Sequence, residues 1–109
     1  MKIVKIAAAL KRLKKISDEI RYRSCFEQKQ FTGGLIAFKP AKKSNPKQIS
    51  HGNQDVICQV LQGSGRLRID GRRIRLVPGT LCHIPKKTPH DFAASRSAEL
   101  VLLYLLIKT

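Results

Sequence analysis

The sequence contains few of the side chains on which whole classes of function depend. It has no tryptophan, four phenylalanines and two tyrosines, so it offers little base stacking for single-stranded nucleic acid. No apolar run approaches the ~20 residues that a helix needs to cross a bilayer, because the longest, at 100–107, is only as long as a strand. No small-residue cleavage site closes the N-terminal apolar stretch, which argues against a signal peptide.

Acidic side chains are also scarce. The chain has 7 Asp and Glu residues against 22 Lys and Arg residues, which gives a net charge of +15 at neutral pH. Such an excess attracts anionic partners, from nucleic acid to small phosphates and carboxylates, but it carries no information about the fold.

The cysteines are few and widely spaced. Cys25, Cys58 and Cys82 form no CxxC motif, and their number is odd. This pattern predicts free thiols in a reducing compartment, and therefore a cytoplasmic protein. Cys58 and Cys82 lie within apolar strand-like runs, where a small buried apolar side chain is the favoured interpretation.

The length of 109 residues predicts a single domain over residues 1–109. Residues 5–22 are predicted to form an amphipathic helix, because apolar side chains from Ile6 to Ile20 recur at steps of three and four residues. We expect its apolar side to pack on the rest of the domain. The same pattern also permits a basic helix that contacts a membrane surface or nucleic acid.

Beyond residue 31 the pattern changes to short apolar runs separated by Gly, Pro, Asp and Ser. The expected strands are 32–40, 55–62, 65–70, 72–77, 80–85, 90–94 and 99–107. Many short strands behind one helix indicate an all-β sandwich or barrel over residues 32–107. We find no internal repeat.

The clearest local feature is the Asp70-Gly71 dipeptide between two β runs. It predicts a two-residue turn of type I′, because both central residues then need positive φ. The resulting register places four arginines on one face of the hairpin: Arg66, Arg68, Arg73 and Arg75. These side chains either spread into solvent and meet acidic residues elsewhere, or form an anion-facing or subunit-facing surface.

Residues 49–94 resemble the cupin superfamily, whose fold is a double-stranded β-barrel, or jelly roll. His51 stands at the second histidine of the family's first motif, and Gly63 at its closing glycine. Gly79, Pro85 and His90 match the second motif at the family's spacing. The resemblance implies a cupin barrel with a pocket at its mouth, where His51 and His90 would lie.

The departures from the motifs concern the residues that would bind a metal. Cupins of the enzymatic type offer three histidines and one carboxylate to Zn, Mn, Fe, Ni or Cu. Here Ile49 and Val56 occupy two of those four positions, and Lys87 and Ala94 replace the family's Gly and Asn in the second motif.

The remaining candidate metal ligands are His51, His90 and Asp55. Asp55 lies one residue before the glutamate position, so regular strand alternation would point it the other way unless a bulge turns it inward. His83 is a substitute donor from a neighbouring strand. Without a metal, the two motif histidines would act as hydrogen-bonding groups or as acid and base.

Three functions are compatible with these residues. The first is a cupin that binds a small, anionic molecule in a pocket lined by His51, His90, Cys58 and His83. The second is a metal-dependent cupin enzyme of the dioxygenase or isomerase type. The third, which the scarcity of aromatics disfavours, is a nucleic-acid-binding basic protein. A homodimer is expected from the resemblance, with the apolar final strand 99–107 as an edge that invites pairing.

Overall fold

The computed structural model describes residues 1–40 and 52–109. These contain one short helix and nine strands: α1 (Ile6–Leu10), β1 (Lys14–Lys15), β2 (Ile20–Glu27), β3 (Phe31–Phe38), β4 (Gln54–Gln62), β5 (Gly65–Ile69), β6 (Arg72–Leu76), β7 (Leu81–Ile84), β8 (His90–Ala94) and β9 (Leu100–Lys108). The candidate residue His51 lies outside the described residues.

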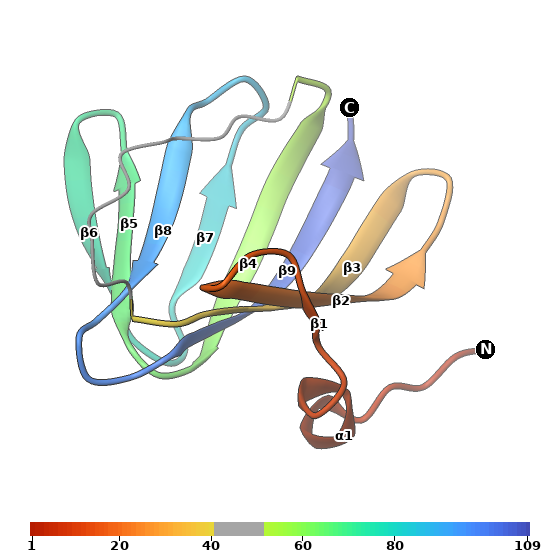
Figure 1. The fold of residues 1–109 in the computed structure, drawn as a ribbon. Coiled ribbons are helices and arrows are strands. Elements are labelled where there is room, and N and C mark those ends of the chain that lie inside the picture. Colours follow the sequence, from red (N-terminus) through yellow and green to blue (C-terminus); the bar gives the residue numbers. More distant parts are fainter. Residues whose placement is uncertain (41–51) are drawn as a thin grey trace.

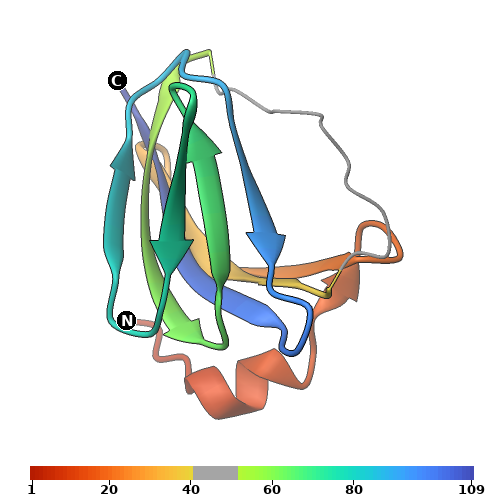
Figure 2. The same cartoon turned by 90° about the vertical axis from the view of Figure 1, so that its left-hand side faces the viewer.

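The strands form two antiparallel sheets (Figures 1 and 2). The larger sheet has the order β1-β2-β3-β9-β4-β7, and the smaller has the order β6-β5-β8. This is the jelly-roll arrangement expected from the resemblance, with one helix near the N-terminus. No helix in the described part of the chain is long and apolar enough to cross a membrane.

Apolar side chains gather in two places. The inner core, between the sheets, is formed by Val56, Cys58, Val60, Leu67, Leu76, Ile84, Leu100 and Leu102. The outer cluster, formed by Ala9, Cys25 and Leu35, lies on the other side of the larger sheet beneath α1. Strand alternation explains the division, because Leu35 belongs to the outer cluster while its neighbour Ile36 packs against the inner core.

The predicted helix over residues 5–22 is wrong in its length. Helix α1 ends at Leu10, and β1, a turn and β2 follow. The cations at Lys11, Arg12, Lys14 and Lys15 would repel one another at helical spacing. The Ser17 hydroxyl instead accepts hydrogen bonds from the amides of Glu19 (3.3 Å) and Ile20 (3.2 Å), which stabilises a turn.

Strand pairing explains the C-terminal end of the predicted helix. Ile20, the last apolar residue of the helical pattern, is opposite Phe38 in β3, and Tyr22 is opposite Ile36. The pairing of β2 with β3 supplies long-range contacts that an isolated helix lacks, so tertiary contacts override the local periodicity. Ile16, predicted to lie on the buried side, is 60% exposed.

The strands predicted beyond residue 31 are confirmed to within one or two residues. The Asp70-Gly71 turn is confirmed too, since both residues have positive φ (51° and 72°). In the predicted register, Arg66 is opposite Arg75 and Arg68 is opposite Arg73.

The expected edge position of the final strand is wrong. β9 lies between β3 and β4 and pairs with both along most of its length. Both of its faces meet apolar side chains, which explains its almost unbroken apolar sequence. The edges of the larger sheet are β1 and β7.

Three positions of the two cupin-like motifs have a left-handed backbone. Gly63 and Gly79 have φ of 77° and 89°, which explains why glycine stands there. A Cβ on Gly63 would also overlap the backbone carbonyl of Glu99. Lys87, which replaces the family's glycine, has φ of 64° and therefore adopts a conformation that disfavours a side chain.

Gly63→Ala is expected to destabilise the protein by about 3 kcal/mol, because the backbone between β4 and β5 must move away from Glu99 to make room for the added Cβ. Gly71→Ala is the matched control: its φ is similar, but a Cβ there meets open space, so we expect a loss of about 1 kcal/mol. Urea unfolding of both variants measures the difference. Equal losses would contradict the proposed steric cause.

Lys87→Gly is expected to raise the free energy of unfolding by about 0.5–1 kcal/mol, because glycine adopts the left-handed conformation without a Cβ penalty. Lys86→Gly, at a neighbouring position without positive φ, should lower it by a similar amount. Urea unfolding compares the two. A loss of stability in both would show that position 87 carries no backbone strain.

Candidate functional site between the sheets

His90, the first residue of β8, is a buried polar side chain beside the inner core. It is 1% exposed. Its Nδ1 lies 2.9 Å from the backbone carbonyl oxygen of Thr88. Because a carbonyl only accepts, Nδ1 carries the proton, and in the neutral ring Nε2 carries the lone pair.

The surroundings of His90 are aromatic and apolar. Its ring meets Phe92 edge-on at 5.8 Å between centroids, and Phe92 lies 5.7 Å from Phe38 of the larger sheet. His90 is opposite Ile69 in β5, which packs against the inner core. A polar group in such surroundings interacts strongly with any charge that enters, because little water screens it.

Tyr104 is a second polar side chain on the inner side, and the sequence analysis missed it. It packs against the inner core from β9, and a Cβ on Gly34 would lie 2.6 Å from its hydroxyl oxygen. Burial raises the pKa of the phenol, so the hydroxyl remains protonated and can donate a hydrogen bond. Its alternation with Leu100 and Leu102 is the sequence signal that would have found it.

Asp55 and His83 face the outer side of the larger sheet. Their neighbours Val56 and Ile84 are buried in the inner core, so strand alternation turns both side chains outward. The Asp55 carboxylate lies 3.2 Å from His83 Nε2 and accepts a hydrogen bond of 2.9 Å from the amide of Lys86. These bonds, first the one from Lys86, lower the pKa of Asp55.

The described residues bring too few metal-ligating side chains together to hold an ion. Within residues 1–40 and 52–109, no three His, Cys, Asp or Glu side chains gather where they could hold one ion. Since Asp55 and His83 face outward, a metal at His90 would need further donors from residues that the structure does not describe, where His51 lies. We therefore derive no metal-dependent step.

The four hairpin arginines lie on the outer face of the smaller sheet. Leu67, between two of them on β5, points into the inner core, so strand alternation turns the arginines outward. Arg68 forms an ion pair of 2.6 Å with Asp91 of β8. Arg66, Arg73 and Arg75 are exposed. This surface is therefore separate from the interior that His90 faces.

Cys58 and Cys82 lie directly opposite each other on β4 and β7. Cys58 belongs to the inner core and Cys82 packs against it, whereas Cys25 belongs to the outer cluster. All three are free thiols. A pocket-lining role was predicted for both Cys58 and His83. Cys58 lies on the inner side, as that role requires, whereas His83 lies on the outer side.

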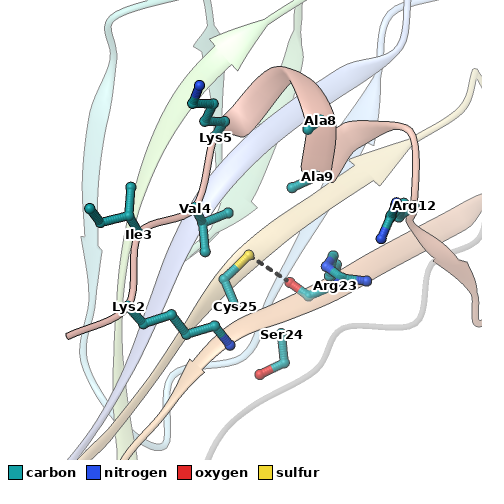
Figure 3. A pocket seen from close by; sticks show the side chains of 10 residues that line it. All are labelled: Lys2, Ile3, Val4, Lys5, Ala8, Ala9, Arg12, Arg23, Ser24 and Cys25. Atoms are coloured by element: carbon teal, nitrogen blue, oxygen red, sulfur yellow. Dashed lines mark hydrogen bonds between the residues drawn. The ribbon is translucent and has the colours of Figure 1, made fainter.

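A pocket of about 370 Å³ lies between the N-terminal segment, α1 and β2 (Figure 3). Its described lining includes four basic side chains, Lys2, Lys5, Arg12 and Arg23, and no acidic one. Arg23 is opposite Leu35 of the outer cluster, so this pocket is on the far side of the larger sheet from the inner core. Its charge favours an anion, which makes it a second place where anions could bind.

Three comparisons place the chain among known proteins. The search of curated proteins found no significant match. The fold resembles TT1209 from Thermus thermophilus, with a TM-score of 0.76 and 23% identity, covering 99% of this chain and 98% of that one. It also resembles the polyketide cyclase RemF from Streptomyces resistomycificus, with a TM-score of 0.81 and 20% identity, covering 98% and 79%.

A third similar structure is described as a predicted oxalate decarboxylase from Thermotoga maritima. Its TM-score is 0.78 at 15% identity, covering 89% of this chain and 92% of that one. At such low identities these likenesses concern the fold alone. The sequence profile of the Cupin domain matches residues 34–107, which is most of the chain. The chain therefore belongs to the cupin family.

Proposed function

We propose that this cupin binds a small anionic molecule between its two sheets, with His90 as the principal polar contact. The observation that carries the proposal is the burial of His90: it is 1% exposed and lies beside Phe92. Sites for small molecules in barrels are mostly apolar, with a few polar groups that fix the orientation of the ligand. The residues around His90 have this composition.

The chemistry of His90 suits an anion. The bond from Nδ1 to the Thr88 carbonyl holds the ring in place on the inner side. An imidazolium group donates charge-assisted hydrogen bonds to carboxylate or phosphate oxygens. The hydroxyl of Tyr104 is a second hydrogen-bond donor on the inner side.

The net charge of +15 supports the same class of ligand, because it raises the local concentration of anions around the molecule. Oxalate is a suitable probe, since one structurally similar protein is described as a predicted oxalate decarboxylase. Inorganic phosphate is the second probe. We propose no reaction.

Calorimetric titration with oxalate and with phosphate tests the proposal. We expect at least one of them to bind, and His90→Gln to raise its dissociation constant about tenfold through loss of a charge-assisted hydrogen bond. Arg23→Gln is the control: it removes one of the four cations of the basic pocket and should leave binding unchanged. Circular dichroism establishes that both variants are folded.

Binding that is lost in Arg23→Gln but retained in His90→Gln would place the anion in the basic pocket and overturn the proposal. The metal-dependent alternative is separated by elemental analysis of the purified protein and by titration after dialysis against a chelator. Stoichiometric transition metal, together with binding that a chelator abolishes, would favour that alternative. Unchanged binding after dialysis is the result expected here.

A further inference from the structure

The pairing of β4 with β7 places two thiols side by side. Cys58 and Cys82 are direct partners in the antiparallel register, next to the partners Val56 and Ile84. Partners in such a register project to the same face, and here that face is the inner core.

The strand register places the two Cα atoms within the range of separations that a disulfide spans. Direct partners in an antiparallel pair have Cα atoms about 4.5–5.5 Å apart. Disulfides span Cα separations of about 4.4–6.8 Å. The strands therefore already hold Cys58 and Cys82 at a distance that a disulfide bridges.

The two thiols differ in exposure and in acidity. Cys82 is partly exposed on the edge strand β7, whereas Cys58 is 2% exposed. The hydrogen bond from Cys58 lowers the pKa of Cys82 to about 7, and the same contact together with burial raises the pKa of Cys58. Cys82 is thus the thiol that an oxidant can reach as a thiolate. Cys58 is the buried, protonated thiol beside it and would act as the resolving cysteine.

We propose that Cys58 and Cys82 form a redox-active dithiol that hydrogen peroxide converts into an intramolecular disulfide across β4 and β7. In the first step the Cys82 thiolate attacks one peroxide oxygen, the O–O bond breaks, and the products are Cys82 sulfenic acid and hydroxide. In the second step the Cys58 sulfur attacks the Cys82 sulfur and displaces the hydroxyl group. The Cys58 proton leaves with that group as water, so two thiols and one peroxide give one disulfide and two waters.

The position of the pair gives the modification a structural consequence. Among the described strands β7 pairs only with β4, so a disulfide would fix this edge strand to the larger sheet covalently. It also replaces two thiols on the inner side with an apolar bridge next to Tyr104, which is opposite Cys58 on β9. This inference is independent of the proposed anion site, because it needs no ligand.

Mass spectrometry of the native protein treated with hydrogen peroxide tests the proposal. We expect the intact mass to fall by two hydrogen atoms and a digest to yield a peptide that links Cys58 to Cys82, with Cys25 still alkylatable. Dithiothreitol should reverse both changes. Cys82 should react about tenfold faster than Cys25, because Cys82 is partly exposed and its pKa is lowered, whereas Cys25 is buried.

Variants identify the order of the steps. In Cys58→Ser, Cys82 should accumulate as a sulfenic acid that a dimedone probe traps, whereas Cys82→Ser should abolish fast oxidation. Cys25→Ser is the matched control and should form the disulfide normally. Native protein that retains both thiols, accumulates sulfenic acid at Cys82, or links through Cys25 would overturn the proposal, whether or not the variants fold.

Discussion

The fold depends on burying both faces of β9. This strand pairs with β3 without interruption from Phe31 opposite Ile107 to Phe38 opposite Leu100, and it pairs with β4 on its other edge. Leu100 and Leu102 belong to the inner core, while Leu103 packs against the outer cluster. Each buried leucine side chain contributes about 1.5–3 kcal/mol through loss of contact with water, so this strand favours the sandwich over any open arrangement.

The same constraint determines which functional side chains face the core and which face outward. With β9 central and the smaller sheet opposite, alternate residues of β4, β5 and β8 must point either into the core or to the outside. His90 and Cys58 therefore face inward, whereas Asp55 and the four hairpin arginines face outward. The four hairpin arginines and the buried His90 thus belong to different surfaces, and of these only His90 lies within the sandwich.

The sequence predicted those features that are set by neighbouring residues. Strand alternation and turn residues located β3 to β9, and the Asp70-Gly71 turn alone determined the register of its hairpin. The predicted helix failed beyond Leu10, because the spacing of Ile16 and Ile20 fits a helix as well as a β-hairpin, and only pairing with β3 decides between them.

The site was less predictable, because it depends on contacts between distant strands. The resemblance identified His90, and alternation anticipated the outward direction of Asp55. The partners of His90 could not be found, since Phe38 reaches Phe92 across the two sheets. The pairing of Cys58 with Cys82 likewise follows from the register of β4 with β7, which no local pattern encodes.

The central claim, that His90 is the polar contact for an anion between the sheets, is tested most directly by NMR of its imidazole nitrogens. In the free protein we expect the proton on Nδ1, as the bond to Thr88 requires. Addition of oxalate or phosphate should then shift the ring nitrogen resonances as His90 gains a charge-assisted hydrogen bond to the anion. A free protein without a proton on Nδ1, or ring nitrogen resonances that neither anion shifts, would contradict the claim.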